Sequence, residues 1–172
     1  GAGHREAGFA VRPHVKTHKC VEIARLQREA GAAGITVATV GEAEVFAAAG
    51  FDDIFIAYPV WVDADKGRRL GELAAACRLR IGVDSVPGAQ QLAEHAAGVP
   101  LEVIVEVDSG HHRSGVEPSA AGALARGAVE AGLDCVGVFT FPGHSYAAAG
   151  GRERAARDEA AALSQAAASL QE

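Results

Sequence analysis

The residues best suited to chemistry gather in three short segments, each at the end of an apolar run rich in β-branched residues. Residues 12–19 read RPHVKTHK, residues 106–115 read EVDSGHHRSG, and residues 141–146 read FPGHSY. They combine amine, guanidinium, imidazole and phenol groups with glycines that permit tight turns. Side chains of this kind at the carboxyl ends of parallel strands are typical of a small-molecule site.

Lys16 is the candidate nucleophile. If residues 10–15 form a strand, Arg12, His14 and Lys16 share its inward face. A lysine on that face loses part of its hydration, which favours the neutral amine that forms a Schiff base with a carbonyl. Lys19, near the start of the following helix, is expected to be solvated. Spacing alone leaves open that Lys16 is an ordinary loop lysine.

Arg113 is the candidate anion-binding residue. Gly110 and Gly115 permit a turn that brings Arg113 back over the ends of the strands, where a guanidinium can hold an anionic oxygen. A solvated loop arginine is the alternative. His111 and His112 are adjacent, and neighbouring residues rarely converge on one metal ion, so no metal site is predicted there.

His144 and Tyr146 follow the Gly143 turn after the last strand and are expected at the same opening. Two structural alternatives remain open. Tyr146 could cover the helix that follows, and His144 could be a hydrogen-bonded structural histidine.

Composition narrows the class of partner. The 22 acidic and 16 basic residues give a net charge of -6, which disfavours nucleic acid and anionic membranes and favours a small-molecule substrate. Three widely spaced cysteines do not suggest a disulfide framework, and no membrane-spanning run or secretion signal is evident, so a cytoplasmic protein is expected. The chain has no Met, even at position 1, which suggests a piece of a longer protein.

The three segments belong to a regular alternation of strands and Ala-rich helices. Strands are predicted at 10–15, 35–39, 54–58, 79–83, 101–107 and 136–141, and helices at 20–30, 42–49, 65–76, 87–97, 119–131 and 152–170. Strict alternation implies parallel strands with right-handed crossovers. Because one strand face is apolar while the other turns polar towards its carboxyl end, the pattern favours an incomplete TIM-type (β/α) barrel of about six units spanning residues 1–172.

Five blocks carry a family resemblance: RPHVKTHK (12–19), ATVGEAE (38–44), IAYPV (56–60), DSGHHRSG (108–115) and GHSY (143–146). In this order they resemble the N-terminal barrel of zinc- and pyridoxal-phosphate-dependent D-serine dehydratases. These enzymes share the alanine-racemase-like barrel with D-threonine aldolases.

The resemblance implies roles for individual residues. Lys16 matches the lysine that binds pyridoxal phosphate covalently, Arg113 the arginine that contacts the cofactor's phenolic oxygen, and Tyr146 a tyrosine near its pyridine nitrogen. His14 and His144, on the same segments, are added as cofactor-binding residues. The zinc ligands of the family lie in a C-terminal β-domain, beyond Glu172, so no metal ligand is assigned in this chain.

The resemblance also implies an activity, namely β-elimination of D-serine to pyruvate and ammonia by a full-length homodimer. Three alternatives stay open. They are a D-threonine or 3-hydroxy-D-amino acid aldolase, an amino acid racemase, and a non-catalytic pyridoxal-phosphate homeostasis protein on the same barrel.

Overall fold

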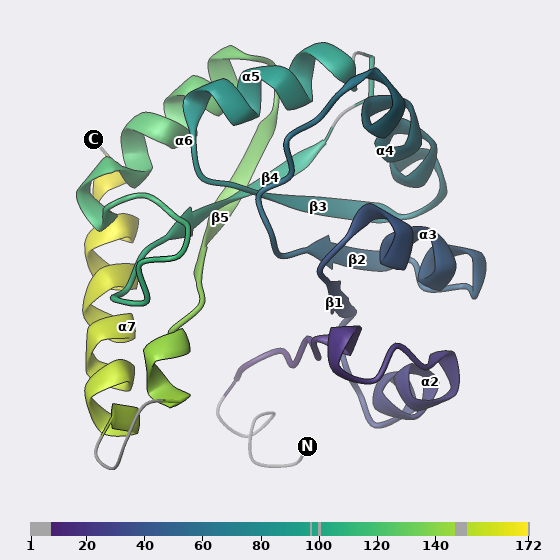
Figure 1. The fold of residues 1–172 in the computed structure, drawn as a ribbon, viewed down its shortest axis with the longest axis horizontal. Helices are drawn as coiled ribbons and strands as arrows, with labels where there is room; N and C mark the ends of the chain where they lie inside the picture. Colours follow the sequence, from purple (N-terminus) through teal and green to yellow (C-terminus); the bar gives the residue numbers. More distant parts are fainter. Residues whose placement is uncertain (1–7, 97, 100, 147–150, 172) are drawn as a thin grey trace.

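The computed structural model describes residues 8–96, 98–99, 101–146 and 151–171. Its centre is a parallel five-stranded sheet in the order β1-β2-β3-β4-β5 (Figure 1). The strands are β1 Ile35–Val37, β2 Asp53–Ile56, β3 Arg78–Val83, β4 Glu102–Val107 and β5 Asp134–Thr140. Spatial order follows chain order, as successive β/α units require.

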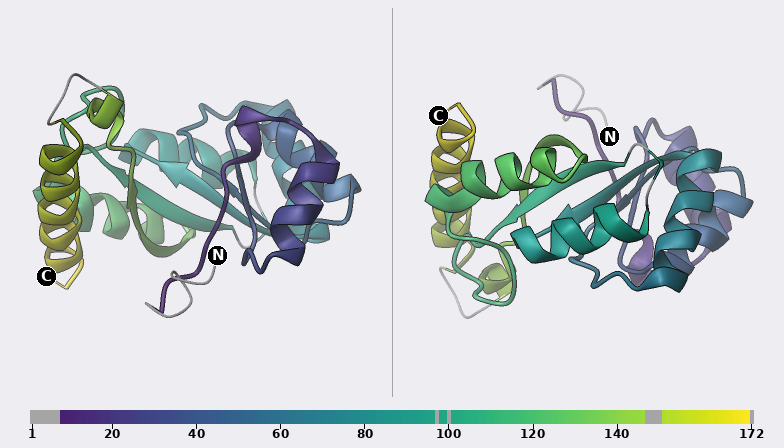
Figure 2. Two further views of the ribbon diagram at one scale, coloured as in Figure 1. Left: turned by 90° about the horizontal axis from the view of Figure 1, so that it is seen from below. Right: turned by 90° about the horizontal axis from the view of Figure 1, so that it is seen from above.

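Helices follow one another around the outside of the sheet in chain order, with α2 and α7 at opposite ends (Figures 1 and 2). They are α2 Val21–Glu29, α3 Val40–Ala48, α4 Ala64–Ala76, α5 Val86–His95, α6 Ala121–Glu130 and α7 Gly151–Ser169. Each predicted helix is present, and its ends lie within two residues of the predicted ones. Residue 97, the predicted end of the fourth helix, lies outside the described residues. None of the helices in the described part of the chain combines the length and apolarity needed to span a bilayer.

Residues 10–15 were expected to form the first strand, and this prediction is wrong. The segment runs beside β1, but only His14 makes a β-bridge, to Thr36. Pro13 accepts a hydrogen bond from Thr36 N (2.8 Å) and has no N–H with which to continue a ladder. After the bridge the chain enters the 3-10 turn η1 (Val15–Thr17).

The hydrophobic core lies between the sheet and the helices. It takes alternate residues from β1 to β4, as a pleated sheet requires. The fully or almost fully buried strand residues on this outer face include Ile35, Val37, Ile54, Ile56, Leu79, Ile81, Val83, Val103, Val105 and Val107.

The inner face of the sheet is polar at both ends, whereas polarity was expected only towards the carboxyl ends. At the amino-terminal ends, an ionic network joins the first segment to three strands; it consists of Arg12, Asp53, Arg78, Arg80 and Glu102. Asp53 accepts from Arg12 Nη2 at 2.9 Å and from Arg80 Nη1 at 2.6 Å. The network occupies this end of the inner face, so Arg12 is structural.

Above the ionic network the inner face is aromatic. Phe55 and Phe139 pack edge to face with ring centroids 4.9 Å apart. They fit there because Gly82 has no side chain; a Cβ on Gly82 would lie 3.0 Å from the Phe139 ring. This layer separates the ionic network from the carboxyl ends of the strands.

Asp53→Asn is expected to lower the free energy of unfolding by about 2 kcal/mol at neutral pH, because two partly buried guanidinium groups lose their shared carboxylate. Burial opposes ionisation of Asp53, but Arg12 and Arg80 outweigh it and hold the pKa of Asp53 below its ordinary value. The carboxylate therefore contributes fully above the unfolded-state pKa of about 4 and loses its contribution as the pH falls through the lower folded-state pKa. Urea titrations of both proteins should show their difference shrinking at acidic pH, and a pH-independent difference would contradict the assignment.

Candidate active site at the carboxyl ends of the strands

Phe141, just beyond β5, contacts three of the five predicted site residues, namely Lys16, Arg113 and Tyr146. The Lys16 Nζ lies 5.6 Å from the centre of the Phe141 ring, and the Arg113 Cζ lies 4.7 Å from it. Arg113 also lies over the Tyr58 ring, at 5.6 Å. Cations over aromatic faces are attracted by the ring quadrupole. The fold thus brings Lys16 and Arg113, nearly a hundred residues apart in sequence, to one aromatic ring.

Lys16 lies in the 3-10 turn η1 and not on a strand. Its side chain is exposed in the described structure, so the expected loss of hydration is not observed. The reason is that the pairing with β1 stops at His14, so that no strand pairing continues to Lys16. The loop position considered as an alternative is therefore correct, although the amine still lies over Phe141.

His14 is partly buried directly before this turn, and its Nδ1 accepts a hydrogen bond from Lys16 N at 3.4 Å. Burial lowers the pKa of His14, and the nearby Lys16 charge lowers it further. A lowered pKa favours the neutral imidazole near pH 7. His14 can thus present a neutral ring beside the lysine, and its contact with a cofactor stays a prediction.

Lys19 is 67% exposed, as expected, but it is not free. Its Nζ lies 3.1 Å from Glu42 Oε1, while Glu42 Oε2 accepts from Ala38 N at 2.7 Å. Lys19 also has a positive φ of 49°, which is uncommon for a residue with a Cβ. Lys19 therefore links the turn to α3, whereas the Lys16 amine lies over Phe141 and is the candidate nucleophile.

The loop that carries Arg113 is shaped by Asp108 and Gly115. Asp108 Oδ1 accepts from Gly110 N and His112 N at 2.9 and 3.0 Å, and its Oδ2 lies 2.7 Å from His112 Nδ1. Gly115 has a φ of +96°, and a Cβ there would lie 2.7 Å from Asp108 N. The predicted tight turn is confirmed, and it places Arg113 over the aromatic rings.

Glu106 is a site residue that the sequence reasoning did not single out. It lies at the end of β4, its side chain is only 3% exposed, and it accepts from Ser114 Oγ at 2.9 Å. Arg113 Nη2 is 3.9 Å from Glu106 Oε1. Burial raises the pKa of Glu106, and Ser114 and Arg113 only partly oppose this. The available signal was an acidic residue between two valines near the carboxyl end of a strand.

His144 packs between two parts of the structure. A Cβ on Gly110 would be 3.4 Å from the His144 ring, and His144 Nε2 lies 3.4 Å from Asp158 Oδ2 on α7. Within the described residues neither ring nitrogen makes a hydrogen bond. Packing thus holds His144 beside the Gly110 loop, but His144 is not the hydrogen-bonded histidine of the structural alternative, and its contact with a cofactor stays a prediction.

Tyr146 ends the 3-10 turn η3 (Gly143–Tyr146) and is 84% exposed. Its ring lies 6.4 Å from that of Phe141, tilted by 39°. The His111 ring also packs edge to face against the Phe141 ring, with the ring centroids 5.5 Å apart. Tyr146 is therefore beside the opening with its side chain largely in solvent, and its hydrogen bond to a pyridine nitrogen stays a prediction.

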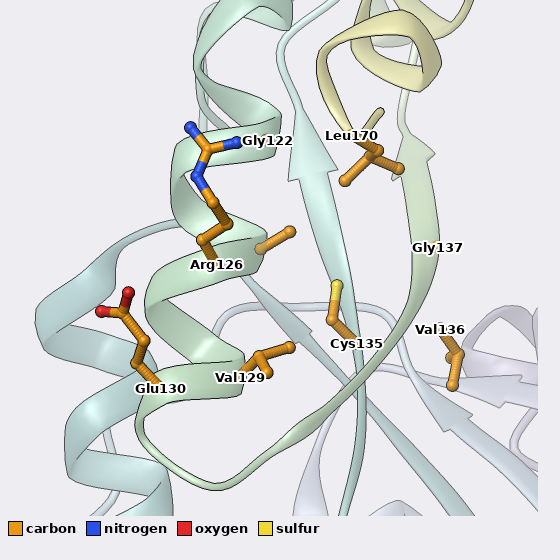
Figure 3. A pocket seen from close by; sticks show the side chains of 9 residues that line it. Gly122, Arg126, Val129, Glu130, Cys135, Val136, Gly137 and Leu170 are labelled. Carbon is orange, nitrogen blue, oxygen red and sulfur yellow. The ribbon is translucent and has the colours of Figure 1, made fainter. Parts of the chain in front are cut away.

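A sizeable cavity lies elsewhere. It is an open groove of about 540 Å³ between α6, β5 and the end of α7 (Figure 3). Its lining is mostly apolar, with Arg126, Glu130 and Cys135 as the polar members. It follows the free edge of β5, which pairs only with β4 among the described strands. Across all of the described residues, no group of three or more His, Cys, Asp or Glu could hold a metal ion.

The family described as alanine racemase, N-terminal domain, matches residues 4–172. Among solved structures, D-threonine aldolase from Filomicrobium marinum matches 99% of this chain and 47% of its own, with a TM-score of 0.86 and 31% identity. D-threo-3-hydroxyaspartate dehydratase from Delftia sp. HT23 matches 98% of this chain and 46% of its own, with a TM-score of 0.86 and 38% identity. The described sheet is therefore part of an alanine-racemase-like barrel.

Curated relatives fall into two length classes. An uncharacterized protein of Mycobacterium tuberculosis is 47% identical over 134 residues, covering 73% of this chain and 77% of the relative. D-threo-3-hydroxyaspartate dehydratase of Delftia sp. is 42% identical over 148 residues, covering 81% of this chain but 38% of the relative. The chain thus spans less than half the length of the enzymes and solved structures named here.

Proposed function

Since the chain belongs to the alanine racemase N-terminal domain family, we propose that it binds pyridoxal phosphate through Lys16 and acts on a 3-hydroxy-D-amino acid. The observation that carries the proposal is the convergence of Lys16 and Arg113 on the Phe141 ring. An amine that can bond to an aldehyde and a guanidinium that can hold a phenolate, beside two aromatic rings, fit this cofactor's reactive groups.

In this proposal the chain's own residues divide the work. When bound, pyridoxal phosphate would withdraw electrons from the substrate's α-carbon. Lys16 would hold the cofactor and, once released, take the proton from the substrate's Cα. Arg113 would hold the phenolic oxygen, and Tyr146 would donate to or accept from the pyridine nitrogen.

We propose elimination of the β-hydroxyl in preference to aldol cleavage, with D-serine as the substrate. Support comes from the dehydratase-like IAYPV and GHSY blocks and from similarity to a dehydratase of Delftia sp.. A relative named D-threonine aldolase, from Arthrobacter sp., is 42% identical over 113 residues, so aldol cleavage is the second candidate. Departure of hydroxide would need an acid such as zinc, whose ligands are proposed to lie beyond Glu172.

Incubation of the natural full-length protein and pyridoxal phosphate with D-serine, D-threonine and D-threo-3-hydroxyaspartate separates these reactions. Elimination releases ammonia and a 2-oxo acid, aldol cleavage releases glycine and an aldehyde, and racemisation yields a mixture of the D- and L-amino acids and neither set of products. Cofactor binding with no product from any substrate would support the non-catalytic alternative. We also propose that the protein is a cytoplasmic homodimer. Size-exclusion chromatography with light scattering would measure its oligomeric state.

A further inference from the structure

The buried carboxyl group of Glu106 has only part of its hydrogen-bonding capacity satisfied. Oε1 accepts from Ser114 at 2.9 Å, but Oε2, which is fully buried, has no hydrogen-bond partner within the described residues. Leaving a buried carboxyl oxygen without a partner is costly. A role beyond packing would explain why an ionisable residue, and not an apolar one, occupies this buried position.

Arg113 is the one cation whose side chain the structure places within ion-pair range of Glu106, among the described residues. The Arg113 side chain is 37% exposed, and its guanidinium lies over Phe141 and Tyr58. Among the described residues Glu106 is its one ion-pair partner. The other charged groups acting on Glu106 are Asp84 and Asp108, and both disfavour its ionisation. Arg113 therefore provides the main charge that favours a carboxylate at this position.

We propose that Glu106 is a positioning residue that holds the Arg113 guanidinium over the Phe141 ring, beside Lys16. The inference rests on the proposed function for its consequence, namely cofactor affinity, but the position of Arg113 can be measured without any cofactor. Ser114 orients the carboxyl group by its hydrogen bond to Oε1, and the Arg113 Nη2 lies 3.9 Å from the same oxygen, within range of charge attraction.

The test compares wild type with Glu106→Gln in the natural full-length protein. Glutamine keeps the size and can still accept from Ser114, but it cannot carry the charge that attracts Arg113. Without cofactor, phenylglyoxal should modify Arg113 several-fold faster in E106Q, as followed by peptide mass spectrometry. Exposed Arg126 on α6 serves as the internal reference. Affinity for pyridoxal phosphate should fall about tenfold, as expected for loss of one charge-assisted contact.

If Glu106 only stabilised the fold, E106Q would lower the melting temperature and leave the reactivity of Arg113 unchanged. The proposal predicts the opposite. Because burial raises the pKa of Glu106, its ionisation destabilises the folded state as pH rises above the unfolded-state pKa. E106Q removes this effect, so its melting temperature should equal or exceed that of wild type at neutral pH while Arg113 becomes more reactive. Glu102→Gln, on the same strand and face but in the ionic network, should lower the melting temperature and leave Arg113 reactivity unchanged.

Equal phenylglyoxal reactivity of Arg113 in wild type and E106Q would overturn the proposal, whether or not cofactor binds. Failure of the proposed function looks different, because wild type itself would then show no visible absorption with pyridoxal phosphate. In that case the reactivity of Arg113 still decides whether Glu106 holds it.

Discussion

Lys16→Ala is expected to abolish the visible absorption of bound pyridoxal phosphate and to reduce turnover of the substrate by about 10⁴-fold or more. The substitution removes both the amine that would bond to the cofactor and the base that would take the Cα proton. Because the side chain is exposed and lies in a turn, the fold should be unaffected. Absorption spectra and borohydride trapping would measure the loss of the bond to the cofactor, and single-turnover kinetics would measure the loss of turnover.

Lys19→Ala is the matched control, since Lys19 lies three residues further on and pairs with Glu42. It should retain the absorption band and be trapped by borohydride as wild type is. Equal trapping in K16A and wild type would remove Lys16 from the site. A second readout needs no cofactor: K16A should raise the pKa of His14, because the Lys16 charge is one of the two causes that lower it. An NMR titration of His14 would show this shift.

The sequence predicted the outer half of the fold well because the signals there are local. Runs of β-branched residues mark the strands, and glycines such as Gly50, with a φ of +88°, end helices where only a left-handed residue fits. The segment 10–15 has the same apolar alternation, yet it forms only one bridge. Pro13 interrupts the ladder and β1 offers only three residues as a partner. Strand formation there depends on the neighbouring strand, which a local pattern does not describe.

The sequence predicted the loops of the site but not the side-chain contacts between its strands. Gly110, Gly115 and the charge of Arg113 are readable as a turn that presents an anion-binding group. The role of Phe141 as the shared surface, and the partnership of Arg113 with Glu106, depend on which side chains meet across β4 and β5. Those contacts follow from strand register, including the shift between Val103 and Ile104, which the sequence does not reveal.

Arg113→Lys is expected to weaken pyridoxal phosphate binding about 10- to 100-fold while the protein keeps its melting temperature. Lysine keeps the positive charge but lacks the planar guanidinium, which stacks over Phe141 and Tyr58 and can bond to two acceptors at once. Since the Arg113 side chain is partly exposed and its loop is held by Asp108, the turn should persist. Fluorescence titration with pyridoxal phosphate and thermal denaturation would measure the two quantities.

Arg126→Lys provides the control, because Arg126 is an exposed arginine on α6 that lines the groove beside β5 and has no part in the proposed site. It should change neither quantity. Arg113→Met extends the series by removing the charge as well, and it should weaken binding further than Arg113→Lys if charge and geometry both contribute. Equal affinities for wild type, Arg113→Lys and Arg113→Met would mean that Arg113 is the solvated loop arginine of the alternative interpretation. The cofactor's phenolic oxygen would then need another partner.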